Sequence, residues 1–136
     1  MVLAVRRVLI LEDDSGGRED LRRLLELWGH EVHVAGDWAR ALALSLSRRP
    51  DAVVMDLRLR DGDALYAIRR IKADCARVRV IAFSGWHEAE VGARAAGADA
   101  FVLKPDLDGL ERLLRELPPR AAEAAPGKKD RATSGN

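Results

Sequence analysis

Four short apolar runs in this 136-residue chain are each followed directly by side chains that could bind a metal ion or a phosphoryl group. These side chains belong to Glu12, Asp13, Asp14, Asp56, Ser84 and Lys104. Carboxylates crowded at one place repel one another unless a cation offsets their charge. Mg²⁺ takes oxygen ligands from one or two carboxylates and also binds phosphate oxygens. These residue types together therefore predict a site for a divalent cation and a phosphoryl group.

Each of these residues alone also has a plainer interpretation. An acidic run before a helix is typical of an N-cap, a serine before a glycine is typical of a turn, and a lysine is usually a surface charge. The composition supports a functional role for Lys104, because residues 1–117 contain 17 arginines and only two lysines, Lys72 and Lys104. A compact ammonium group suits a single phosphoryl oxygen.

The elements that must position these residues alternate along the chain. Apolar runs at 8–11, 32–35, 52–55, 78–83 and 100–103 predict five strands that are buried on both faces. Amphipathic stretches with helical spacing follow each run and predict five helices. We expect a doubly wound α/β fold, with a five-stranded parallel sheet in the order 2-1-3-4-5 and helices on both faces. The carboxyl ends of the strands then bring the candidate residues to one edge of the sheet.

The helices differ in how strongly the sequence predicts them. Asp37 is expected to cap a helix that ends near residue 48, and Pro118-Pro119 is expected to end the last helix. The helix over 87–96 is weak, because it contains Gly92 and has only Val91 as a large apolar anchor. A weakly anchored helix suits an element that can shift its position.

Composition excludes several classes of protein. The formal net charge is +1, which argues against nucleic-acid binding driven by bulk charge. Residues 118–136 carry +2 and lack apolar anchors, so we expect a disordered tail or linker after a domain over 1–117. A single cysteine, Cys75, and the lack of a long apolar run favour a cytoplasmic protein with no membrane contact.

Four motifs in order resemble the receiver domain of two-component response regulators, of the single-domain type similar to the chemotaxis regulator. The motifs are Val-Leu-Ile-Leu-Glu-Asp-Asp at 8–14, the segment 51–63 around Asp56, Val-Ile-Ala-Phe-Ser-Gly at 80–85, and the segment 97–105 that ends in Lys-Pro. The resemblance runs from about residue 7 to 117 and implies a flavodoxin-like fold. It also implies a phosphoprotein of a phosphorelay, not a classical enzyme.

The resemblance implies roles for the acidic residues. Asp56 would be the phosphoacceptor, a carboxylate nucleophile that forms an aspartyl phosphate. Asp13 would bind Mg²⁺ directly, with Mn²⁺ as an alternative ion, and Glu12 would act through water. Asp56 and the backbone carbonyl of Arg58 would complete the protein ligands.

The remaining site residues would bind phosphate or transmit its presence. Ser84 and Lys104 would hold phosphoryl oxygens, and an inward turn of Phe101 would follow Ser84 in the conformational switch. Pro105 would form a cis peptide bond with Lys104. The expected partners are a sensor histidine kinase or phosphotransfer protein and a downstream protein target, which binds the face from strand four to helix five. We expect no direct contact with nucleic acid, and a monomer or weak homodimer.

Three residues depart from the family's pattern, and none of them removes a chemical group of the site. Arg60 and Ala64 replace the usual proline and glycine after the nucleophile. Asp106 replaces a common phenylalanine, so we expect the last helix to begin with an acidic cap. Two alternatives to a phosphorylated receiver remain. One is a receiver-like module that binds proteins without phosphorylation, which predicts missing site residues that this sequence does not lack. The other is an aspartyl-phosphate phosphatase of similar topology, which would need a second carboxylate where this chain has Arg58.

Overall fold

The computed structural model describes residues 6–59 and 63–118. The expectations for Arg60 and for the tail over 119–136 lie outside these residues. Five strands form one parallel sheet in the order β2-β1-β3-β4-β5. The strands are β1 (Arg7–Leu11), β2 (Glu31–Ala35), β3 (Ala52–Met55), β4 (Arg79–Ser84) and β5 (Ala100–Leu103). The predicted sheet and its strand order are therefore confirmed.

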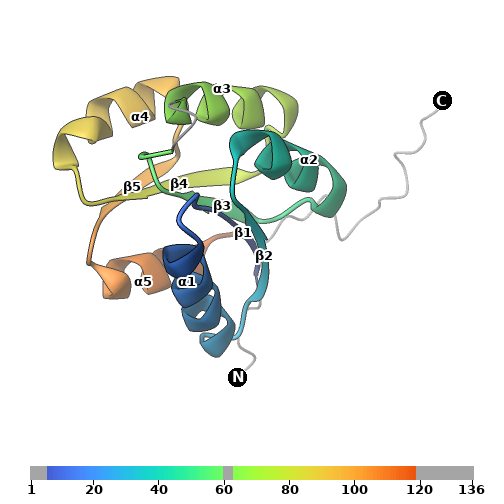
Figure 1. Cartoon of the computed structure of the whole chain (residues 1–136), viewed down its shortest axis with the longest axis vertical. Helices are drawn as coiled ribbons and strands as arrows, with labels where there is room; N and C mark the ends of the chain where they lie inside the picture. Colours follow the sequence, from blue (N-terminus) through green and yellow to red (C-terminus); the bar gives the residue numbers. More distant parts are fainter. Residues whose placement is uncertain (1–5, 60–62, 119–136) are drawn as a thin grey trace.

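Helices cover both faces of this sheet (Figure 1). They are α1 (Ser15–Leu27), α2 (Trp38–Arg48), α3 (Ala64–Asp74), α4 (Glu90–Ala96) and α5 (Leu107–Glu116), with a short 3₁₀ turn (His87–Ala89) before α4. Helices α1 and α5 lie on one face, and α2, α3 and α4 lie on the other. Among the described residues no helix combines the length and the apolar character needed to cross a membrane.

Two apolar clusters, one on each face, hold the layers together. Alternate residues of β1 show the division: Leu9 and Leu11 pack into the cluster under α2, α3 and α4, whereas Val8 and Ile10 pack into the cluster under α1 and α5. Side chains of a strand alternate between its two faces, so a strand covered on both faces is apolar throughout. This explains why the strands appear in the sequence as continuous apolar runs.

Aspartates begin four of the helices. Asp14, Asp37, Asp63 and Asp106 each accept a hydrogen bond from a backbone amide three residues later. Such caps satisfy amides that have no partner within the helix. The expected cap at Asp37 and the expected acidic start of α5 at Asp106 are confirmed. Of the acidic run at 12–14, Asp14 is the residue that serves as a cap.

Helix α4 differs from the sequence-based expectation. Val91 was expected to anchor it, but the side chain of Val91 is 80% exposed. Ala93 and Ala96 are the buried residues of this helix. Gly97 ends α4 with a φ of 119°, a conformation that favours glycine. Small side chains thus attach α4 to the sheet, which keeps its contact area low.

Candidate functional site

The predicted site residues Glu12, Asp56, Ser84 and Lys104 meet at the carboxyl ends of β1, β3, β4 and β5. The parallel register places these strand ends side by side, and short backbone hydrogen bonds join them. The amide of Asp56 donates to the carbonyl of Leu11 at 3.1 Å, and the amide of Lys104 donates to the carbonyl of Ser84 at 2.8 Å. Each functional residue is therefore tied to the neighbouring strand.

Lys104 supplies the positive charge of the site. Its Nζ lies 3.5 Å from Oδ2 of Asp56 and 3.9 Å from Oε1 of Glu12. The same ammonium group lies 5.4 Å from the centroid of the Phe83 ring, close enough for a cation–π contact. The other lysine of residues 1–117, Lys72, instead bonds to Asp99 and to the carbonyl of Val78. Lys104 thus balances two carboxylates, whereas Lys72 holds α3 against the start of β4 and β5.

Burial and a like charge act together on Glu12. Its side chain is 11% exposed, and burial raises the pKa of its carboxyl from 4.5 to about 7. The neighbouring Asp56 carboxylate also raises this pKa, whereas the amide of Asp14 and the charge of Lys104 lower it. Burial is the largest of these effects. When both carboxylates are ionised, the single ammonium group beside them offsets one of the two negative charges.

Oxygen donors with excess negative charge fit Mg²⁺, which binds one or two carboxylates and keeps several waters. Glu12 and Asp56 lie beside the same lysine ammonium and so provide two such carboxylates. Within 6–59 and 63–118, no group of three or more His, Cys, Asp or Glu side chains is arranged to hold a metal ion. Asp13 is partly exposed beside this pair, and its role as a direct ligand stays a prediction.

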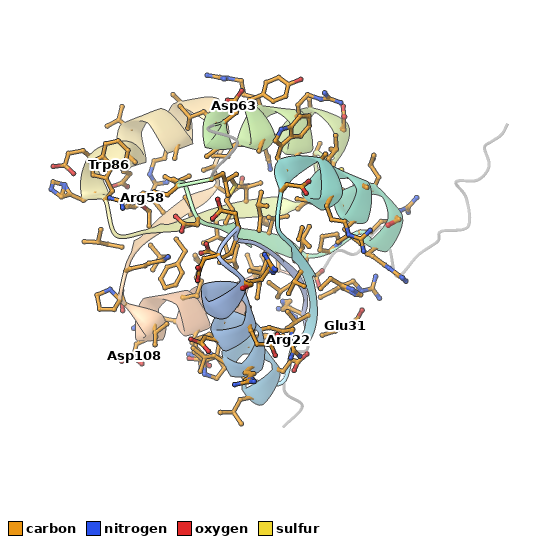
Figure 2. All side chains as sticks on the ribbon, in the orientation of Figure 1. Arg22, Glu31, Arg58, Asp63, Trp86 and Asp108 are labelled. Atoms are coloured by element: carbon orange, nitrogen blue, oxygen red, sulfur yellow. The ribbon has the colours of Figure 1, made fainter. Side chains whose placement is uncertain are left out.

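Ser84 and Trp86 form a turn after β4. The side chain of Ser84 is buried, and its Oγ accepts a hydrogen bond from the amide of Trp86 at 3.1 Å. In Figure 2, Trp86 and Arg58 lie on the same side of the molecule, on the loops that follow β4 and β3. The amide of Arg58 donates to Oδ1 of Asp56 at 3.0 Å. Both loops are therefore bonded to residues of the site.

The other predicted residues lie near this group. Phe101 is half-buried on β5 and packs against the cluster under α2, α3 and α4. The peptide bond between Lys104 and Pro105 is cis, as expected. Ala64 is buried at the start of α3. A cavity of about 240 Å³ adjoins the site and is lined by Glu12, Asp20, Leu24, Asp56, Phe83 and Leu107, among others.

Sequence reasoning missed Arg18. Its Nη1 donates to the backbone carbonyl of Glu12 at 2.8 Å, so it touches the chain between the two predicted acidic residues. A partial signal was present, because Arg18 lies in the first turn of a helix that begins directly after the acidic run. An arginine in a first turn is usually interpreted as a surface charge, so its type alone did not reveal this contact.

The raised pKa of Glu12 predicts how stability depends on pH without metal. Between pH 4.5 and about 7 the folded chain keeps a proton on Glu12 that the unfolded chain releases. The free energy of unfolding should therefore fall by about 2–3 kcal/mol across this range relative to Glu12→Gln. Urea unfolding of both proteins at about pH 5 and about pH 8, with a chelator present, measures the difference.

Glu31→Gln is the matched control for this prediction. A hydrogen bond with His33, and Arg7 nearby, lower the pKa of the exposed Glu31 carboxyl. Ionised Glu31 therefore adds stability above its unfolded pKa of 4.5 and loses it as the pH falls. Relative to its own variant, Glu31 should therefore change stability little between about pH 5 and about pH 8, whereas Glu12 should change it strongly. Parallel pH curves for the wild type and Glu12→Gln would contradict the assignment.

Comparison with known proteins places this geometry among signalling domains. The family model for the response regulator receiver domain matches residues 8–115. The response regulator MprA of Mycobacterium sp. (strain KMS) is 35% identical over 113 residues, which cover 82% of this chain and 48% of MprA. The chain spans between about a quarter and a half of the length of the curated relatives it matches.

Solved structures give the same result. The receiver domain of the sensor histidine kinase PA1611 from Pseudomonas aeruginosa PAO1, with a magnesium ion in its active site cleft, is 27% identical. Its TM-score is 0.74, and the match covers 84% of this chain and 98% of that one. A CheY-like receiver domain from Methylobacillus flagellatus is 26% identical with a TM-score of 0.73, and the match covers 85% and 100% of the two chains.

Proposed function

The chain belongs to the response regulator receiver domain family, and on that premise we propose that Asp56 accepts a phosphoryl group from a phosphohistidine of a partner protein. The observation that carries the proposal is the placement of the Lys104 ammonium beside both the Asp56 and the Glu12 carboxylates. The family supports a role in two-component signalling, and this placement supports Asp56 as the reacting residue.

The proposed step exchanges one bond to phosphorus for another. An oxygen of the Asp56 carboxylate attacks the phosphorus atom in line with the histidine nitrogen. An oxygen–phosphorus bond forms, the nitrogen–phosphorus bond breaks, and its electron pair stays on the imidazole of the partner. Lys104 and the Ser84 hydroxyl bind the phosphoryl oxygens, on which the negative charge is spread. The chain thereby promotes its own modification and does not turn over a separate substrate.

Asp13, Asp56, the carbonyl of Arg58 and, through water, Glu12 would hold Mg²⁺ in this proposal. The bound ion would neutralise charge on the carboxylates and on the phosphoryl oxygens. Burial, and after it the neighbouring Asp56 carboxylate, raise the pKa of Glu12. A bound cation would oppose both effects, because it favours the ionised carboxylate.

The test uses the whole chain and a small phosphodonor such as acetyl phosphate. We expect intact mass spectrometry to show one added phosphoryl group when Mg²⁺ is present and none when a chelator replaces it. Peptide mapping should place the group on the peptide that contains Asp56. An unmodified wild type, or a group on another peptide, would refute the proposal. Addition of a phosphohistidine-containing kinase domain then tests the partner class.

We further propose that the signal leaves through the face formed by β4, α4, β5 and α5. Of the six large apolar side chains exposed in the described residues, four belong to this part of the chain: Trp86, Val91, Leu103 and Leu107. Exposed apolar side chains that cluster are typical of surfaces that bind other proteins. A phosphoryl group would draw Ser84 inward and allow Phe101 to follow, which would change this face.

Trp86 offers a direct measurement of this movement. Its side chain is 50% exposed, and its amide is bonded to Ser84 Oγ. Inward movement of the hydroxyl would break this hydrogen bond and change the environment of the indole. In a chain with Trp28→Phe and Trp38→Phe, we expect the fluorescence of Trp86 to change on addition of Mg²⁺ and beryllofluoride. Ser84→Ala in the same background should lose most of the response, and binding without any change in fluorescence would contradict the switch.

A further inference from the structure

Arg18 and Glu12 are joined through the backbone at the predicted metal site. Nη1 of Arg18 donates to the carbonyl oxygen of Glu12 at 2.8 Å. This carbonyl belongs to the peptide bond between Glu12 and Asp13, so its orientation sets the direction in which the backbone enters Asp13. On the other side of Glu12, its amide donates to the carbonyl of Ala35 at 3.1 Å. The two peptide groups that flank Glu12 are therefore held by α1 and by the end of β2.

Gly36 leaves the space that the Arg18 guanidinium occupies. A Cβ atom added at Gly36 would lie 2.8 Å from Nη1 of Arg18, closer than real Cβ contacts. Gly36 is not among the described glycines with a positive φ, so its backbone conformation does not require glycine. In Figure 1, α1 and β2 lie side by side, as their contacts also show. The end of β2 thus provides both a carbonyl for Glu12 and room for Arg18.

We propose that Arg18, in the space left by Gly36, is a positioning residue that orients the Glu12–Asp13 peptide so that Asp13 can bind Mg²⁺. The inference rests on the proposed function for the identity of the cation. Groups that orient metal ligands through hydrogen bonds typically change metal affinity by about 10–100-fold when they are removed. A charged donor on a carbonyl makes a stronger hydrogen bond than a neutral one, which suits this task.

The charge of Arg18 alone would have the opposite effect on affinity. A guanidinium near acidic ligands repels a divalent cation, so removal of this charge should strengthen Mg²⁺ binding. If orientation dominates, removal of Arg18 should weaken binding. The sign of the change in affinity therefore separates the two effects.

The experiment is a calorimetric titration of the full chain with Mg²⁺. Arg18→Ala removes the donor, and Gly36→Ala keeps the charge but obliges the guanidinium, at the end of a flexible side chain, to shift from its position at the carbonyl. We expect the dissociation constant for Mg²⁺ to rise about tenfold or more in Arg18→Ala and by a smaller factor in Gly36→Ala. Arg18→Lys, which keeps a charged donor, should recover part of the loss.

Two matched controls should leave the affinity unchanged. Arg22 lies one turn further along α1 and pairs with Glu19 and Glu26, away from the site. Arg22→Ala therefore removes the same charge from the same helix. Gly92 in α4 would place a Cβ 3.7 Å from its nearest neighbour, an ordinary contact. Gly92→Ala therefore tests the effect of the added methyl group alone.

The possible results distinguish this inference from the proposed function. Unchanged or tighter Mg²⁺ binding in Arg18→Ala, unchanged binding in Gly36→Ala, or a wild type that binds no Mg²⁺ would overturn the inference. A wild type that binds Mg²⁺ but accepts no phosphoryl group would refute the proposed function. The Mg²⁺ affinities of the variants would still decide whether Arg18 is a positioning residue. With saturating Mg²⁺, phosphorylation of both variants should return towards the wild-type rate, which a general loss of structure would not allow. If Arg18→Ala fails to fold, Gly36→Ala decides.

Discussion

Asp56→Asn is expected to take up no phosphoryl group under conditions in which the wild type is modified stoichiometrically. An asparagine amide has nearly the same shape as the carboxylate but cannot act as the oxygen nucleophile that forms an acyl phosphate. The Asn side-chain oxygen can still accept the hydrogen bond that the amide of Arg58 donates to Asp56. The loop after β3 should therefore keep its conformation, so the loss reports on chemistry. Intact mass after incubation with Mg²⁺ and acetyl phosphate measures it.

Asp14→Asn is the matched control for this loss. Asp14 belongs to the same acidic edge but caps α1 by accepting a hydrogen bond from the amide of Gly17 at 2.7 Å. Asparagine caps helices about as well as aspartate, so the fold should be unaffected. We expect Asp14→Asn to be phosphorylated like the wild type. Equal amounts of phosphate on Asp56→Asn and on the wild type would show that another residue is the phosphoacceptor.

Lys104→Ala is expected to slow phosphorylation by about 10²–10³-fold, the usual cost of removing one group that stabilises transition-state charge. The same change should strengthen Mg²⁺ binding at about pH 8, because the ammonium near Glu12 and Asp56 competes with a divalent cation for these carboxylates. Slower chemistry together with tighter metal binding cannot result from misfolding. Phosphorylation rates and Mg²⁺ calorimetry on the same protein samples test both parts.

Lys72→Ala provides the comparison for Lys104. Lys72 bonds to Asp99 and to the carbonyl of Val78, so its loss should lower stability and leave the phosphorylation rate near that of the wild type. A similar loss of rate in both lysine variants would show that stability, and not the charge beside Asp56, sets the rate. Weaker Mg²⁺ binding in Lys104→Ala would contradict the proposed position of the ammonium.

The sheet and the principal site residues could be predicted from the sequence because they follow from one simple pattern. Strands buried on both faces are continuous apolar runs, and parallel strands bring the residues that follow them to one edge. Asp56 and Lys104 are 48 positions apart in the sequence, yet the strand order predicts that they lie at the same edge of the sheet, with one strand between them. The raised pKa of Glu12 was not predictable in the same way, since it depends on how deeply the side chain is buried.

The features of the structure that differ from the sequence-based predictions have a common physical origin. Val91 is apolar, but the face of α4 that meets the sheet carries Ala93 and Ala96, so local hydrophobicity did not identify the buried side. The contact between Arg18 and the carbonyl of Glu12 depends on a backbone atom and on the missing side chain of Gly36. Neither a backbone carbonyl nor an empty space has a sequence signature. Patterns of side-chain type therefore predict layers and strand ends but not contacts of this kind.

The alternation of β1 and β3 side chains between two cores limits how the length of this chain can be changed. An extra residue inside β3 would move every following side chain of that strand to the opposite face and would misplace Asp56. An extra residue in an exposed connection changes neither the alternation nor the strand ends. Protein engineers who wish to insert a reporter peptide or a binding epitope should therefore use exposed connections at the amino ends of the strands, such as the one between α3 and β4, where Ala76 and Arg77 are exposed. Insertions there leave intact the spacing from each buried strand to its reactive end.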